Sequence, residues 1–300
     1  MGAGRDARVD GDIDHQILKE SVMAEKESLL NTLLGLSMIV EARDPYTGGH
    51  LWRVSQFSKL LAQQAGLSQR DIALCEVGGF LHDLGKIGVS DSILNKPDRL
   101  TDPEYDIIKT HPAVGGRLLS NHPLANLAFD AVVGHHERPD GKGYPHGLAG
   151  EVIPEVARIV SIADAFDAMT STRAYRKGMR MEKALGIISD ETGRQFDAGL
   201  AKHFLTLSGT SELAHIVGHS EPGLPLFQCG CGAPLAIRSA QRDGDHVYCH
   251  CCGSESRLSK HGDERKLEMT GVKGDASVLA PDCDTDLIGA MVEEIAPHVL

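Results

Sequence analysis

The first strong pattern along the chain is a repeat of apolar residues in its N-terminal part. The repeat consists of Ile17, Leu18, Val22, Leu29, Leu33, Leu36 and Val40. Spacings of three and four place these side chains on one face of a helix over residues 13–40. Some of them are also seven residues apart, which leaves two interpretations open. This helix is either a first core helix with a frayed polar start or a parallel dimer helix that relays an upstream signal.

Helical periodicity continues to about residue 207, and alternation with a period of two is almost absent before residue 210. Ser68 and Asp197 are good N-cap residues. Thr101 and Glu104 form a capping box with Pro103 in the first turn. The predicted helices span residues 50–64, 69–84, 101–118, 124–136, 154–169, 181–189 and 198–207. The first two-thirds of the chain should therefore be all-α.

The amino-acid composition changes after Gly209, where Gly, Pro and Ser become more frequent. Short strands are predicted at residues 234–238 and 246–248, and residues 286–299 are expected to form an amphipathic helix. We divide the chain into an N-terminal tail and signalling or dimer helix (1–34), a helical domain (35–207), a linker (208–224), a cysteine-containing strand module (225–256), and a polar tail with the terminal helix (257–300).

The net charge of the chain limits the classes of molecule that it is expected to bind. A formal net charge of −12 argues against a binder of nucleic acid polymers that relies on backbone electrostatics. It does not exclude a small phosphorylated substrate, because metal cations would dominate the local field. No stretch approaches the ~20 apolar residues that span a bilayer, and no signal-peptide core follows Met1, so we expect a cytoplasmic protein.

Five of the seven cysteines lie between residues 229 and 252, which indicates metal binding in a reducing compartment rather than a disulfide framework. Cys229, Cys231, Cys249 and Cys252 supply four thiolates, enough for a closed tetrahedral zinc site. The first pair is one residue closer than usual, and Cys251 could replace a neighbour. Redox cysteines are the alternative. The expected role of a zinc ribbon here is structural or protein docking.

A second group of metal-binding residue types is centred on the adjacent pair His82 and Asp83. An imidazole can bind one metal ion, and a carboxylate with two oxygens can span two ions. Further residues of this kind are His50, His111, His135, His136 and Asp164. Mixed imidazole and carboxylate ligands suit iron, manganese or zinc without singling out one of them.

Over residues 35–207 the chain resembles the HD-GYP branch of the HD-domain phosphohydrolases. The matching motifs lie at residues 41–50, 82–88, 93–97, 100–104, 111–112, 135–145, 162–170 and 173–176. The resemblance implies an all-helical phosphodiesterase that hydrolyses cyclic di-GMP to linear pGpG, and sometimes onward to GMP. It also implies iron or manganese in the site.

The resemblance further implies ligands for two metals. One metal would be held by His50, His82, Asp83 and Asp164, and the other by Asp83, His111, His135 and His136. Some relatives hold a third metal on a glutamate four residues before the first histidine, and Tyr46 at that position favours two metals here. Glu41 and Asp44 are expected to have structural or supporting roles.

Substrate contacts are expected from a lysine, one loop and two arginines. Lys86 should direct its ammonium at a phosphate oxygen or the leaving group. The loop residues are Arg138, Asp140, Gly143, Tyr144 and Pro145; the tyrosine could stack on a base, and the arginine could contact phosphate or a guanine edge. Arg173 and Arg176 are further phosphate candidates, with surface ion pairs as the alternative. Pro139 and Ala174 depart from the common pattern, which affects these contacts rather than the metal site.

We therefore predict a mainly α protein, an HD-domain helical bundle with a small C-terminal zinc-ribbon-like β appendage. The expected reaction is hydrolysis of cyclic di-GMP through a metal-activated hydroxide at a binuclear site, with Asp83 and Lys86 as catalytic residues. The alternatives are an HD hydrolase of another nucleotide phosphoester and a non-hydrolysing cyclic di-GMP receptor. A homodimer through the N-terminal helix and a signalling partner at the zinc ribbon are the expected protein contacts.

Overall fold

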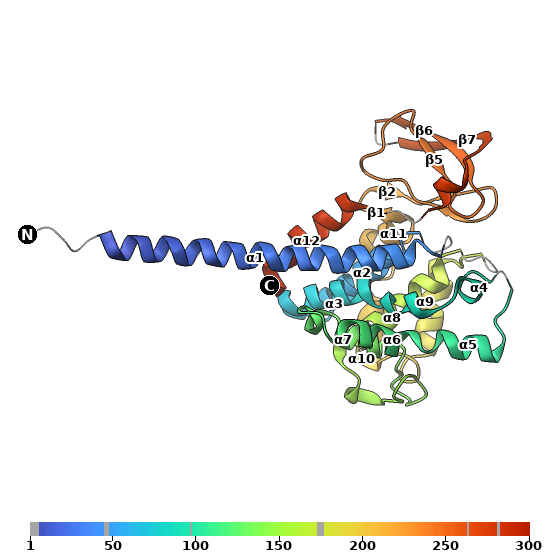
Figure 1. Ribbon diagram of the computed structural model, residues 1–300. Helices are drawn as coiled ribbons and strands as arrows, with labels where there is room; N and C mark the ends of the chain where they lie inside the picture. Colours follow the sequence, from blue (N-terminus) through green and yellow to red (C-terminus); the bar gives the residue numbers. More distant parts are fainter. Residues whose placement is uncertain (1–5, 45–47, 97, 173–176, 263, 281–282) are drawn as a thin grey trace, which may run out of the picture.

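The computed structural model describes residues 6–44, 48–96, 98–172, 177–262, 264–280 and 283–300. Helix α1 (Asp6–Glu41) begins outside the body of the molecule and enters it with its second half (Figure 1). Leu30, Leu33 and Leu34 in that half are buried in the main core, whereas Leu18 and Val22 are exposed. The apolar repeat therefore serves the core only from about its middle onward.

The helical body is built around α2 (His50–Gln64), α3 (Gln69–Leu81) and α8 (Glu155–Thr170), which pack on one another. The smaller helices surround them: α4 (Asp91–Leu94), α5 (Asp102–Ile108), α6 (His111–Leu119), α7 (Phe129–Gly134), α9 (Met181–Asp190) and α10 (Ala198–Thr206), with the 3-10 turns η1 (Leu84–Gly88), η2 (Ala125–Leu127) and η3 (Gly150–Val152). The core is mainly aliphatic, with the rings of Phe57 and Phe204 edge-on to Phe166. The prediction of an all-α body is confirmed.

The predicted helix starts agree with the structure where capping chemistry marks them. Ser68 accepts a hydrogen bond from the backbone of Asp71, and Asp197 caps α10. Thr101 and Glu104 form the predicted capping box.

Two predicted helices are interrupted. The run over residues 101–118 divides into α5 and α6, and the break lies before His111. Pro112 disfavours helical backbone at the residue that precedes it and is accommodated in a first helical turn, so a new helix begins there. The run over residues 124–136 is η2 followed by α7, which ends at Gly134.

The C-terminal third contains more regular structure than the sequence suggested. Residues 208–224, expected to be a linker, include α11 (Ser211–Val217) and a hairpin of β1 (His219–Glu221) and β2 (Leu224–Pro225). The other strands are β3 (Phe227–Gln228), β4 (Pro234–Leu235), β5 (His246–Tyr248), β6 (Ser254–His261) and β7 (Glu264–Lys273), followed by η4 (Ala276–Leu279) and α12 (Thr285–Val299). Strands β5, β6 and β7 form an antiparallel sheet. Where we expected only a polar tail, β6 and β7 form a long hairpin.

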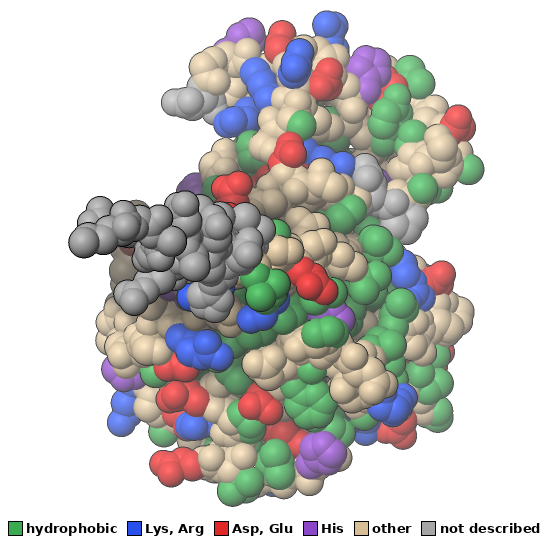
Figure 2. Space-filling model, turned by 60° about the vertical axis from the view of Figure 1, so that its left-hand side comes forward, with side chains coloured by type: hydrophobic (Ala, Val, Ile, Leu, Met, Phe, Trp, Pro, Cys, Tyr) green, Lys and Arg blue, Asp and Glu red, His purple; other side chains and the backbone are tan. Residues whose placement is uncertain are grey.

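The strands form a smaller lobe beside the helical body (Figures 1 and 2), and α12 returns from it to the body. Ile288, Met291 and Ile295 of α12 belong to the main core and lie against α1 and α3. The predicted terminal helix is therefore part of the helical core. Within the described ranges, no helix is both long and apolar enough to cross a bilayer.

Gly85 provides a test of how closely η1 and α6 are packed. A Cβ atom at this position would lie 1.8 Å from the carbonyl oxygen of His111. Overpacking typically costs about 1–3 kcal/mol, and the contact here is with backbone, so Gly85→Ala should reduce the free energy of unfolding by about 3 kcal/mol in urea denaturation. Gly186→Ala is the matched control, because no atom lies within 4 Å of its added Cβ. The control should be neutral or stabilising, and equal stabilities of the two variants would contradict the packing.

The contact between Glu221 of β1 and Asp284, the N-cap of α12, predicts a pH dependence of stability. Burial, together with the neighbouring Asp284 carboxylate, raises the pKa of Glu221 to about 8 from an ordinary 4.5, although Arg238 opposes the shift. The folded chain therefore keeps a proton that the unfolded chain releases, and this stabilisation is complete below about pH 4.5 and is lost as the pH rises towards 8.

Glu221→Gln should remove this part of the pH dependence. Between pH 5 and 8, wild-type protein should lose on the order of 2 kcal/mol more unfolding free energy than the variant in urea titrations. Glu264→Gln, at an exposed position, should follow the wild type. A Glu221→Gln curve that is parallel to the wild-type curve would refute the assignment.

Candidate metal centre

The seven side chains expected to bind metal come from the ends of separate helices and from α8. His50 is the first residue of α2, His82 and Asp83 follow α3, His111 begins α6, His135 and His136 follow α7, and Asp164 lies within α8. The structure brings all seven together. The two adjacent histidines lie just after α7, although the predicted helix over residues 124–136 included them.

Backbone carbonyls orient three of the imidazoles. Nδ1 of His82 lies 2.7 Å from the Gly79 oxygen, and Nδ1 of His111 lies 2.7 Å from the Ile108 oxygen. Nδ1 of His135 is 3.1 Å from carbonyl oxygens in the last turn of α7. Because a carbonyl only accepts, Nδ1 carries the proton in each ring, and in the neutral ring Nε2 is a bare acceptor. This is the tautomer that binds metal through Nε2.

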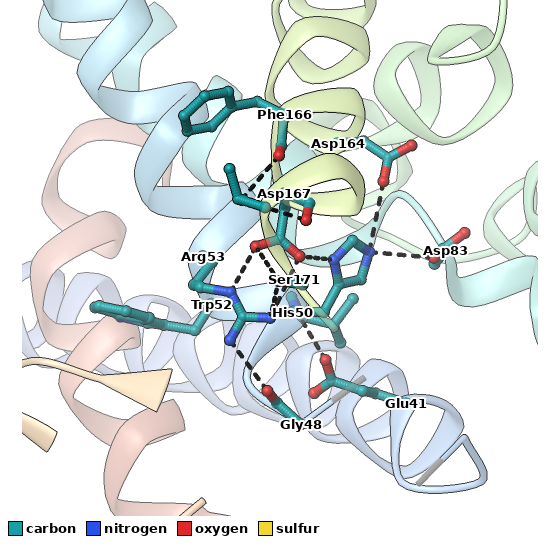
Figure 3. A network of polar contacts seen from close by, with 12 residues as sticks. Glu41, Gly48, His50, Trp52, Arg53, Asp83, Asp164, Phe166, Asp167 and Ser171 are labelled. Atoms are coloured by element: carbon teal, nitrogen blue, oxygen red, sulfur yellow. Dashed lines mark hydrogen bonds and ion pairs between the residues drawn. The ribbon is translucent and has the colours of Figure 1, made fainter. Parts of the chain in front are cut away.

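His50 is oriented by side chains (Figure 3). Its Nδ1 donates to Oδ2 of Asp167 at 2.7 Å, and Asp167 in turn accepts from Nε of Arg53 at 2.5 Å. The opposite nitrogen, Nε2, lies 3.6 Å from an oxygen of Asp83 and 3.6 Å from an oxygen of Asp164. A buried carboxylate therefore fixes the ring so that its bare nitrogen faces the other two carboxylates.

The ligand atoms form overlapping groups within 4.8 Å of one another. The groups are His50, His82 and Asp164; His111, His135 and His136; and His82, Asp83 and His135. The first two groups correspond to the two expected metals, and the Asp83 oxygens face both, at 3.6 Å from His50 and 3.4 Å from His111.

A cation is the natural occupant of such a cluster. The Nε2 atoms of His111 and His135 are only 3.1 Å apart. Both rings donate from Nδ1, so two lone pairs would face each other unless positive charge lay between them. The residues therefore fit divalent metals, whose identity the donor set does not specify.

The electrostatics keep the ligands in their binding forms. Burial lowers the pKa of His135 well below its ordinary value and that of His136 to about 3. Burial alone would raise the pKa of Asp83, but the Lys86 ammonium and His82 hold it well below its usual range. Neutral imidazoles and ionised carboxylates need not release protons before a metal binds.

Lys86 lies at the edge of this cluster. Its Nζ is 2.6 Å from Oδ2 of Asp83, so the ammonium pairs with a carboxylate of the candidate centre. The side chain is 22% exposed. The lysine is therefore close enough to the centre to contact a phosphate group bound there.

The expected substrate loop is folded against the same histidines. The backbone N–H of Tyr144 donates to the His136 carbonyl at 3.2 Å, and the two rings are 4.7 Å apart. The Tyr144–Pro145 peptide bond is cis. Gly143 permits this approach, because a Cβ atom at this position would lie 2.4 Å from the backbone nitrogen of Arg138.

Two acidic residues shape this loop. Asp140 accepts hydrogen bonds from the Arg138 guanidinium through both oxygens, at 3.0 and 2.7 Å. The arginine that was expected to contact phosphate is therefore paired with a carboxylate of its own loop. Glu137 is buried and accepts from the backbone N–H groups of His146 and Leu148 at 2.6 and 2.9 Å. This function of Glu137 was not predicted.

Arg173, Arg176 and Tyr46 lie outside the described residues. Glu41 accepts a hydrogen bond from the Leu51 backbone at 2.9 Å and so supports the start of α2.

Neither Arg53 nor Asp167 was predicted to have a function. The only signal was the spacing of Asp167 from Asp164, three residues apart on one helix.

The four cysteines of the predicted zinc cluster converge in the smaller lobe. Cys229 Sγ is 3.7 Å from Cys252 Sγ, and Cys231 Sγ is 3.6 Å from Cys249 Sγ. All four sulfur atoms lie within 4.8 Å of one another, and Cys251 is not part of this group. This arrangement could bind a metal ion.

Comparisons with known proteins agree with this architecture. RpfG, a cyclic di-GMP phosphodiesterase response regulator of Xanthomonas campestris, is 40% identical over 205 residues, which cover 68% of this chain and 54% of that protein. A cyclic di-GMP phosphodiesterase of Thermotoga maritima is 39% identical over 191 residues, which cover 63% of this chain and 52% of its own. The 3'3'-cGAMP-specific phosphodiesterase 3 of Vibrio cholerae is 39% identical over 160 residues, 53% of this chain and 35% of its own.

The chain spans about half the length of the first two relatives. The model of the HD domain matches residues 35–200. These residues contain every metal-binding candidate outside the cysteine cluster. The chain belongs to the HD domain family, as its resemblance to the HD-GYP branch predicted.

Proposed function

We propose that this chain is a metal-dependent phosphodiesterase that hydrolyses cyclic di-GMP to pGpG, to GMP, or to both. The observation that carries the proposal is the convergence of five imidazoles and two carboxylates within one largely buried cluster. The names of relatives at 39–40% identity support the choice of a cyclic dinucleotide. The catalytic unit would comprise residues 35–207.

The ligands would be shared between two cations, with iron or manganese as our proposal for both. His50, His82, Asp83 and Asp164 would hold one, and Asp83, His111, His135 and His136 the other. Bound divalent cations supply a nucleophilic hydroxide near neutral pH and neutralise charge on the phosphoryl oxygens. Asp83 would contribute one oxygen to each ligand set, which suits its position between the two histidine groups.

The remaining residues would bind and orient the substrate. Lys86, already within 2.6 Å of Asp83, would stabilise negative charge that develops on the phosphate. Tyr144 and Pro145 would receive a base, with Gly143 allowing the close turn. Arg138, oriented by Asp140, would contact a phosphate or guanine edge. Arg173 and Arg176 would add positive charge for the second phosphate.

The protein contacts that we propose lie at both ends of the chain. The exposed Leu18 and Val22 on the projecting half of α1 support a homodimer through this helix. The cysteine module, which extends through the β6–β7 hairpin, would dock a signalling protein. The described cysteines form no disulfide, which suits a reducing compartment such as the cytoplasm.

A second substrate is favoured by one observation. A relative at 39% identity is named a 3'3'-cGAMP-specific phosphodiesterase, so a mixed cyclic dinucleotide is the main competitor. A receptor that binds cyclic di-GMP without hydrolysis is the alternative from another class. The ionised Asp83 beside Lys86 favours turnover, because binding alone does not require this pair.

Hydrolysis is tested with protein purified without oxygen and loaded with iron or manganese, using both cyclic dinucleotides as substrates. Asp83→Asn should reduce turnover by more than about a hundredfold and lower the metal content, since the loss of a supporting residue alone typically costs 10–100-fold. Asp130→Asn, at an exposed position of α7, is the matched control and should stay within about twofold of wild type. Metal-loaded wild type that binds cyclic di-GMP and leaves it intact would exclude the enzyme and favour the receptor.

We also propose that the cysteine cluster holds one zinc ion. The Ser254 hydroxyl, 3.2 Å from Cys252 Sγ, lowers the pKa of that thiol to about 6, which favours a thiolate ligand. Cys252→Ser should remove this one zinc ion, and elemental analysis would measure the loss. Cys251→Ser, next in the chain but outside the cluster, should retain it. Equal zinc loss in both variants would contradict the four-cysteine assignment.

A further inference from the structure

The turn that precedes His50 is covered by the C-terminal part of the chain. Gly49 has a positive φ of 74°, and a Cβ there would lie 2.8 Å from Cα of Ser220 in β1. A Cβ on Gly48 would lie 3.8 Å from Pro234 in β4. Residues far apart in sequence therefore contact the backbone immediately before a metal-binding candidate.

Arg53 connects this contact with the metal centre (Figure 3). The guanidinium is 2% exposed and is fully engaged: Nη1 donates to the carbonyl oxygen of Gly48 at 3.1 Å, and also to that of His219 at 3.3 Å. Nε and Nη2 donate to the two oxygens of Asp167 at 2.5 and 3.3 Å. The rigid fork of arginine thus joins a β1 carbonyl to the carboxylate that orients His50.

We propose that strand β1 is a positioning element of the metal centre and acts on His50 through Arg53 and Asp167. The inference rests on the proposed function only in requiring that His50 binds a metal. The acceptors around Arg53 come from three directions, so the guanidinium cannot shift without losing one of them. If β1 is displaced, Arg53 loses an acceptor and can rotate away from Asp167, and the His50 ring is no longer fixed.

The connection gives the C-terminal region a regulatory function. Ser220 and His219 lie outside the residues that match the HD domain, and β1 is joined through β2 and β3 to Cys229 of the cysteine cluster. A change that loosens this region would weaken metal binding at His50. By thermodynamic linkage, metal binding would stabilise the seating of β1 to the same extent.

The test is a binding measurement on the full chain. Ser220→Phe places a large side chain at a 2% exposed position whose Cα faces Gly49, and it should lift β1 from the turn. Affinity for manganese, measured by competition with a fluorescent chelator, should fall by about 10- to 100-fold in one of the two binding steps. Gln228→Phe, at an exposed position of β3, is the matched control and should leave both steps unchanged.

A double-mutant cycle tests whether Arg53 carries the effect. Arg53→Lys keeps the charge near Asp167 but cannot bridge to the β1 carbonyl, so it should weaken the same step. If β1 acts through Arg53, adding Ser220→Phe to Arg53→Lys should cause little further loss. Losses that multiply, or a Ser220→Phe affinity within twofold of wild type, would overturn the proposal.

Folding and catalysis are separated from the positioning effect. Circular dichroism and the zinc content of the cysteine cluster report whether each variant is folded. If Ser220→Phe does not fold, Ser220→Val replaces it, because it enlarges the side chain at the same contact. The same manganese affinity and the same double-mutant cycle with Arg53→Lys then test the proposal. A coupled loss of manganese affinity in a protein that never hydrolyses cyclic di-GMP would refute the proposed function and leave this inference intact.

Discussion

The structure depends on keeping the buried Asp83 carboxylate charged between imidazoles. A charge in such a position costs several kcal/mol unless it is compensated. Lys86 supplies part of that compensation through an ion pair of 2.6 Å. The imidazoles that surround the carboxylate present bare nitrogens to the same space, so the cluster is complete only with positive charge inside it. The surrounding helices serve to hold these groups together.

Close backbone contacts make this arrangement possible. Gly79 lets α3 approach α2 so closely that a Cβ would lie 2.8 Å from Cα of Ser55, and Gly85 brings η1 against the first residue of α6. These contacts bring the ends of several helices to one point. Because the imidazoles leave from helix ends, backbone carbonyls in the adjacent turns are available to orient them.

The C-terminal region is more than an appendage. Helix α12 contributes to the main core, and β1 covers the turn before α2. An HD domain that ended at α10 would expose the apolar face that α12 covers and would leave the Arg53 guanidinium without one acceptor. The candidate metal centre and the cysteine module are thus joined by a short path of contacts, although they have no residue in common.

The sequence by itself determined the helical class, the helix starts marked by Ser68, Thr101 and Asp197, and the kinds of residue at both clusters. These features are local, because a cap or a period of 3.6 depends on residues within a few positions. The motifs also identified the HD domain. The β6–β7 hairpin was not predicted, because Leu258 is the one apolar residue of β6 and most side chains of β7 are exposed.

The tertiary structure decided how these parts meet. Arg53 and Asp167 are 114 residues apart, and no local pattern indicates that one orients His50 through the other. The seat of β1 on Gly49 depends on the path of the whole chain, as does the pairing of Glu221 with Asp284. Such contacts are set by packing between distant segments, and that is why only the folded chain reveals them.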